Sequence, residues 1–173
     1  MITLAEEKNK SISQDIYDAA LKNIYYFNLP CPSCGHRGCL SGHGHYYKKI
    51  LTESGKILLK MKRVICTCGV THVIFLSSMV PGSSFPAEVH REIAGNGPGN
   101  DTILKLQLRF PDINNTSIRY IFRQFQHHWE QLLLSFSISL ECLNTLIRKC
   151  FSCFSRQFMQ IKHWPNTLFV QPT

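Results

Sequence analysis

Two short cysteine motifs have the residue types and spacing to bind a metal ion. The first is Cys31-Pro32-Ser33-Cys34-Gly35, and the second is Cys66-Thr67-Cys68-Gly69-Val70-Thr71-His72. Each thiol pair precedes a glycine, which lets the backbone curl beneath a tetrahedral Zn²⁺. The segment between the motifs holds too little apolar material to form a core, so bound zinc would supply its folding free energy. We therefore predict one structural Zn²⁺ per chain, held by Cys31, Cys34, Cys66 and Cys68.

Other donors in the same stretch leave the exact ligand set open. Cys39 or His72 can replace Cys66 or Cys68 if the short Cys-x-Cys loop cannot present both sulfurs. The remaining histidines, His36, His43 and His45, are expected to be solvated loop residues. Disulfides or free buried thiols are the alternatives to metal. The first residues carry charges and lack the apolar run of a secretory signal. We therefore expect a cytoplasmic protein, where closely paired cysteines more often bind metal.

The charge balance favours an anionic partner. The chain has 173 residues, with 19 Lys and Arg against 11 Asp and Glu, and a net charge of +8. Nucleic acid is the first candidate and an acidic membrane surface the second, while a merely basic protein is the alternative. The most apolar run, residues 132–147, contains Glu141 and Asn144 and does not fit a membrane span. We expect no membrane partner.

The elements that must position the cysteines are a helix and a β-hairpin. Residues 1–10 look frayed, and a helix is expected from Ser11 or Ser13 to about Phe27. Strands are expected over residues 46–51 and 56–65, joined by a glycine turn, and a third short strand over 73–76. A hairpin bounded by two cysteine turns is the architecture of a zinc ribbon. Its alternation puts Ile57, Leu59 and Met61 on one face and Leu58, Lys60, Lys62 and Val64 on the other.

The second half of the chain reads as helical. A short helix over 86–94 and a glycine-rich linker are followed by a helix from about 101 to 109, although Leu104, Leu106 and Leu108 also alternate like a strand. After a polar turn, Ile118, Phe122, Phe125 and Trp129 lie at helical spacing. A short helix, a tight turn and a longer helix predict a helix-turn-helix. The fold class is thus α+β, with an N-terminal helix (1–29), a zinc ribbon (30–80), a short helix and linker (81–100), the helix-turn-helix region (101–155) and a tail (156–173).

Two groups of residues could contact double-stranded DNA. At the start of the longer helix these are Thr116, Ser117, Arg119, Tyr120 and Arg123, placed to meet base edges in the major groove. Along the hairpin, basic side chains could neutralise phosphates: Lys48, Lys49, Lys56, Lys60, Lys62 and Arg63. Tyr46 and Tyr47 could stack on bases or form the core of the hairpin. A solvated amphipathic helix and a solvated ribbon face are the alternative interpretations.

The order of these parts resembles the transposase-type zinc-ribbon proteins, and is close to a bacterial family of unknown function associated with mobile elements. The first cysteine motif and the segment from Arg63 to His72 carry the resemblance, which covers residues 30–80 well and 100–130 loosely. Cys66-Thr67-Cys68 departs from it, since many ribbons have two intervening residues. The resemblance implies DNA binding without implying a catalytic activity.

Three classes of function remain open at this point. The first is a DNA-binding regulator or accessory factor of a mobile element. The second is a zinc-stapled protein-binding module, such as an inhibitor of a host complex, and the third is a non-catalytic subunit or remnant of a transposase. No catalytic constellation is found, so we do not expect an enzyme. Cys142, Cys150 and Cys153 lie among aromatic residues and are expected to be buried packing residues.

Overall fold

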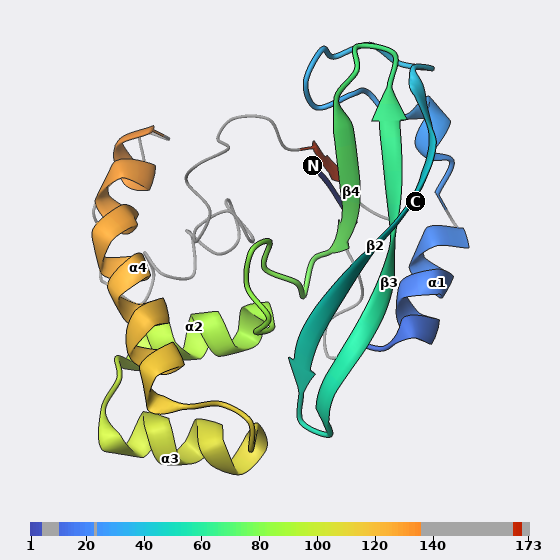
Figure 1. Ribbon diagram of the computed structural model, residues 1–173. Helices are drawn as coiled ribbons and strands as arrows, with labels where there is room; N and C mark the ends of the chain where they lie inside the picture. Colours follow the sequence, from blue (N-terminus) through green and yellow to red (C-terminus); the bar gives the residue numbers. More distant parts are fainter. Residues whose placement is uncertain (5–10, 23, 136–167, 171–173) are drawn as a thin grey trace. The chain divides into compact units, whose positions relative to one another are not determined.

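The computed structural model describes residues 1–4, 11–22, 24–135 and 168–170 of the chain, with the side chains of 128–135 and 168–170 left out. These residues form a mixed α and β structure, as the sequence predicted (Figure 1). They group into two compact units. Unit 1 takes in Met1–Ile50, Ile57–Ser78 and His163–Thr173, and unit 2 takes in Leu51–Lys56 and Met79–Lys162.

Unit 1 is built on a five-stranded sheet with the strand order β2-β3-β4-β1-β5. The long hairpin strands β2 (Leu40–Thr52) and β3 (Gly55–Cys66) form one side of it. Strand β4 (Thr71–Leu76) runs antiparallel to β3, with Arg63 opposite Val73. The short strands β1 (Ile2–Leu4) and β5 (Leu168–Val170) complete the sheet. The predicted glycine turn and three strands are therefore present, and β2 begins earlier than predicted.

The expectation that residues 1–10 are frayed is wrong for the first four. Ile2 and Leu4 are fully buried, because β1 pairs in parallel with β4 and places Ile2 opposite Ile74 and Leu4 opposite Leu76. On its other side β1 pairs in parallel with β5. The start of the chain is therefore an interior strand of the sheet.

Helix α1 (Gln14–Lys22) ends sooner than predicted and is followed by a 3-10 turn, η1 (Tyr26–Asn28). Two side chains of α1 form hydrogen bonds with the backbone of β3. The Tyr17 hydroxyl accepts a hydrogen bond from the Lys62 N–H at 2.8 Å and donates one to the Ile74 carbonyl at 2.9 Å. The Gln14 amide pairs with the Lys60 N–H at 2.9 Å and the Lys60 carbonyl at 3.2 Å. Helix α1 thus supplies hydrogen-bond partners to the backbone of β3 at Lys60 and Lys62.

Burial along β3 follows the predicted alternation only in its first half. Leu59 and Met61 are buried while Leu58 is exposed, as predicted. Val64 was expected on the opposite face, yet it is fully buried. The alternation of buried and exposed residues therefore does not continue past Met61, close to where β3 begins to pair with β4.

Unit 2 is organised around α2 (Ala87–Asn96), α3 (Asn100–Arg109) and α4 (Asn115–Ser135). Half of the predicted linker is helical, because α2 runs on to Asn96 and α3 begins at Asn100, which leaves three residues between them. Gly97 ends α2 with a φ of 73°, a conformation that favours glycine. The core comprises Leu51, Val89, Ile93, Ile103, Leu106, Phe110, Ile113, Ile118 and Ile121.

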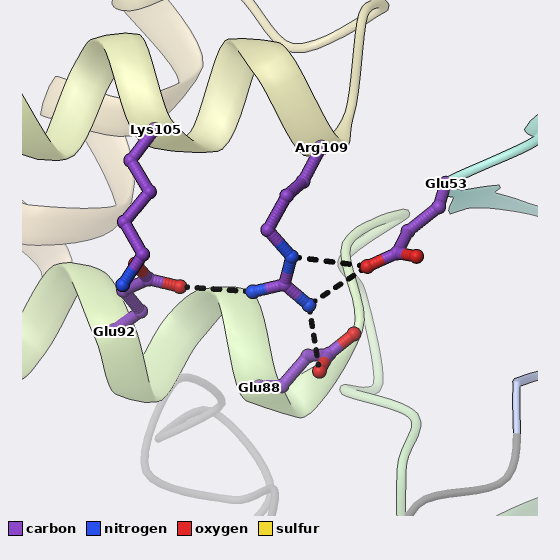
Figure 2. Close-up of polar contacts among 5 residues, drawn as sticks. All are labelled: Glu53, Glu88, Glu92, Lys105 and Arg109. Atoms are coloured by element: carbon purple, nitrogen blue, oxygen red, sulfur yellow. Dashed lines mark hydrogen bonds and ion pairs between the residues drawn. The ribbon is translucent and has the colours of Figure 1, made fainter.

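The tip of the hairpin belongs to unit 2. Leu51 is part of the helical core, and its N–H donates to the Ser84 carbonyl at 2.8 Å. Two residues after Leu51, the Glu53 Oε1 accepts a hydrogen bond from the Arg109 Nε at 3.0 Å. The same oxygen lies 2.9 Å from the Arg109 Nη2 (Figure 2). The same guanidinium contacts Glu88 and Glu92 of α2, each at 3.3 Å, and Lys105 pairs with Glu92 at 2.9 Å. Arg109 therefore ties α3 to both α2 and the hairpin tip.

Several predictions fall outside the described residues. These are the later helix over 140–154, the packing roles of Cys142, Cys150 and Cys153, the inward direction of Trp129, and most of the C-terminal tail. Within that tail, Leu168–Val170 is extended and forms β5. In the part of the chain that the structure describes, no helix has the length and apolar character needed to cross a bilayer.

Candidate metal centre

Four cysteine sulfurs gather at one end of the hairpin. The Sγ atoms of Cys31, Cys34, Cys39 and Cys66 all lie within 4.8 Å of one another, and Cys34 and Cys66 are 3.6 Å apart. All five cysteines of the described residues are free thiols. Four thiolates at about 2.3 Å from a tetrahedral Zn²⁺ stand about 3.8 Å from one another. The donor set and its spacing therefore fit a structural metal ion.

Two similar turns present these sulfurs. In the first, the Gly35 N–H donates to the Cys31 carbonyl at 2.9 Å, and in the second the Gly69 N–H donates to the Cys66 carbonyl at 2.9 Å. Both glycines have left-handed φ values, 75° and 85°, which explains why glycine stands there. In each turn the sulfur of the first cysteine accepts the N–H of the residue two further on, at 3.4 Å. The repeated Cys–Gly pattern of the sequence thus corresponds to a repeated backbone turn.

The second turn stabilises negative charge on the sulfur of Cys66. The N–H of Cys68 is the main cause that lowers the pKa of the Cys66 thiol to about 6, and neighbouring cysteines act in the same direction. A thiol with such a pKa is largely deprotonated at neutral pH, and the thiolate is the form that binds metal. The turn that contains Cys66 is therefore suited to holding a cation.

The sequence predicted Cys68 as the fourth metal ligand. The group of four sulfurs contains Cys39 instead. Cys39 is buried, and its Sγ lies 2.9 Å from the carbonyl oxygen of His36. Cys68 is exposed, with its Sγ 4.0 Å from that of Cys31. The pairing of the hairpin strands could have identified Cys39 as a ligand. Cys39 directly precedes β2 and Cys66 ends β3, so the two cysteines lie at the same end of the hairpin. The Thr67 N–H donates to the Cys39 carbonyl at 3.1 Å, so the hairpin brings Cys39 to the second turn.

His72 lies next to the cluster. Its Nε2 is 3.3 Å from the Cys31 Sγ, and its Nδ1 is 3.0 Å from the Met1 nitrogen. Burial, and to a lesser degree the Met1 amino group, lowers the pKa of His72 to about 4. The ring is therefore neutral at pH 7. If Nδ1 accepts from Met1, Nε2 carries the proton and donates it toward the sulfur, the arrangement by which an outer residue orients a metal ligand.

The predicted basic residues of the hairpin differ in their surroundings. Lys48 is not on the surface: only 7% of it is exposed, its Nζ lies 5.8 Å from the centre of the Phe75 ring, and burial lowers its pKa to about 8. Its placement on an exposed face is wrong, because it alternates with Ile50 on the buried side of β2. Lys49, Lys56 and Lys60 are exposed, while Lys62 and Arg63 are half-buried.

The predicted reading end of the longer helix is exposed. Thr116, Arg119, Tyr120 and Arg123 lie at the surface of α4, and Ser117 is half-buried. Ile118 and Phe125 face the core as predicted, Phe122 is half-buried against it, and Ile121 joins them. No family model, curated protein or solved structure matches the chain.

Proposed function

We propose that the chain is a double-stranded DNA-binding protein that needs structural Zn²⁺ for folding. In this proposal unit 1 is a zinc ribbon, and α3, the turn after it and α4 form a helix-turn-helix. The resemblance to transposase-type zinc-ribbon proteins further suggests an accessory factor or regulator of a mobile element. The thiol cluster supports the zinc, and the exposed end of α4 supports DNA as the partner.

The exposed end of α4 is the observation that carries the DNA proposal. Arg119 and Arg123 stand one turn apart, and Tyr120 between them is 56% exposed. No acidic residue occurs from Asn115 to Trp129 in the sequence of α4. A helix N-terminus adds partial positive charge. This end of the helix therefore offers a positive surface with side chains that can donate to guanine or phosphate.

The turn before α4 holds this end in a defined position. The Ser117 N–H donates to the Asn114 Oδ1 at 2.7 Å, which caps the helix. The Gln107 side chain donates to the Asn115 Oδ1 at 3.0 Å, and the buried Ile113 anchors the turn in the core. A fixed start is what a reading helix requires, because its first side chains must meet the base edges.

The zinc proposal is tested by the metal content of two matched variants. Cys39→Ser should lower bound zinc well below one equivalent, because it removes a thiolate of the buried group of four. Cys68→Ser should keep one equivalent, because the exposed Cys68 lies outside that group. Elemental analysis of protein purified without added metal measures both. If Cys68→Ser loses zinc and Cys39→Ser keeps it, Cys68 is the ligand and Cys39 is not. If the wild-type protein contains no metal and its hairpin is folded, the zinc centre is refuted.

The DNA proposal is tested by a salt titration on one selected duplex and one random duplex. Arg119→Ala and Arg123→Ala should each weaken binding to the selected site by about 1–3 kcal/mol if they contact bases. Arg91→Ala removes an equal charge from the exposed surface of α2 and should change binding much less. If all three variants bind both duplexes as wild type does, the helix is structural and a zinc-stapled protein-binding module becomes the better explanation.

A further inference from the structure

One face of the hairpin in unit 1 combines exposed aromatic and basic side chains. Strand β2 ends at Thr52 and β3 begins at Gly55, so two residues connect them. Counting back from this turn, antiparallel pairing puts Tyr47 opposite Lys60, His45 opposite Lys62 and Lys49 opposite Leu58. Because side chains alternate along a strand, these residues share one face of the sheet. They form what we call the hairpin face: His45, Tyr47, Lys49, Leu58, Lys60 and Lys62.

The burial of the strands agrees with this count. Lys48 and Ile50 are buried on the other side of β2, as are Leu59 and Met61 on β3. On the hairpin face, Tyr47 is 58% and Leu58 60% exposed. The surroundings of His45 agree as well: desolvation lowers its pKa first, then Lys60 and Lys62, while Asp18 of α1 acts in the opposite direction.

The charges of the hairpin face are available to a partner. Among the described residues, Lys49, Lys60 and Lys62 form no ion pair. Lys62 is held near the sheet, with its Nζ 5.7 Å from the centre of the Tyr26 ring. Strand β2 is an outer strand of the sheet, and the Tyr47 side chain on it is exposed. The partner that fits is therefore a polyanion that also offers flat apolar surfaces.

We propose that the hairpin face binds a single strand of nucleic acid, with a base stacked on Tyr47 and its phosphates held by Lys49, Lys60 and Lys62. Aromatic rings on exposed strands stack unpaired bases of any sequence, and lysines beside them follow the backbone. A duplex keeps its bases stacked on one another, so it leaves Tyr47 without a base. The proposal concerns unit 1 and does not depend on duplex binding by α4.

The test uses the full zinc-loaded chain and a labelled oligothymidine of about ten nucleotides, within the usual range for one such surface. Tyr47→Ala should weaken its binding about 5- to 100-fold, the loss expected for one stacked base. Tyr47→Phe keeps the ring and should stay within about twofold of wild type. Tyr46→Ala is the matched control, since Tyr46 is the sequence neighbour on the opposite face and 43% exposed. Circular dichroism shows whether each variant is folded.

If Tyr47→Ala misfolds, a second variant tests the same proposal. Lys60→Ala should reduce the salt dependence of oligothymidine binding by about 0.7 for the one phosphate it loses. The proposal is overturned if wild type binds no oligothymidine, if Tyr47→Ala binds it as wild type does, or if Tyr46→Ala loses as much. Duplex binding by Arg119→Ala is measured separately, so either proposal can fail while the other stands.

Discussion

Removing one oxygen atom from Tyr17 should destabilise unit 1 more than its size suggests. The Tyr17 hydroxyl joins the Lys62 N–H and the Ile74 carbonyl at 2.8 and 2.9 Å, and the residue is fully buried. Burial also raises the pKa of this phenol, so it remains a donor at ordinary pH. Tyr17→Phe leaves a donor and an acceptor without partners in the interior. Each such group costs about 1–3 kcal/mol, so we expect a loss of about 2–6 kcal/mol for the two.

Gln14→Ala is the control for this reasoning, because it removes a similar side-chain bridge at the surface. The Lys60 backbone groups that Gln14 satisfies are exposed, so water can replace it, and we expect a loss below about 1 kcal/mol. Urea unfolding of the purified protein gives both values, and amide hydrogen exchange at Lys62 reports the local change. If Tyr17→Phe costs no more than Gln14→Ala and leaves Lys62 exchange unchanged, the bridge does not hold β3 and β4 together.

Two further changes test the charges described above. Because burial lowers the pKa of Lys48 from 10.5 to about 8, the folded state releases its proton first, and stability should rise between about pH 8 and 10.5. Lys48→Met should remove this rise and increase the free energy of unfolding at pH 7 by up to about 3 kcal/mol. Urea unfolding at several pH values measures both effects, and a pH dependence equal to that of wild type would contradict the prediction. Arg109→Met should destabilise unit 2 by about 1–2 kcal/mol, because three glutamates lose their shared cation, while Lys105→Met should cost less than about 1 kcal/mol. Thermal unfolding in low and high salt measures that difference, which should shrink as salt screens the charges.

The elements that the sequence predicts well are those with a local signal. The hairpin has a glycine turn and alternating residues on both sides, and α4 has apolar residues at helical spacing. Both therefore appear close to their predicted positions. Strand β1 has no such signal, since a segment of three residues is too short to show a period. It exists because Ile2 pairs with Ile74, which lies far along the chain.

In the candidate metal centre, too, features set by neighbouring residues were predicted, and features set by strand pairing were not. The two cysteine turns follow from short motifs, and the structure brings their sulfurs together. The choice between Cys39 and Cys68 depends on the pairing of β2 with β3, which motif spacing does not contain. The burial of Lys48 depends likewise on which face of β2 meets Phe75. Side-chain direction within a correctly predicted strand is therefore what sequence reasoning failed to supply.

The division of the hairpin between the two units limits how their segments can be exchanged with those of other proteins. Residues 51–56 group with the helices, although they lie within the hairpin in sequence. A hybrid joined after Ser78 would carry Leu51 without the core it fills, and the transplanted helices would lack Leu51 as well as the Glu53 that Arg109 contacts. A graft that exchanges the helices must therefore replace residues 51–56 together with them, as one insert at the hairpin tip and one C-terminal segment.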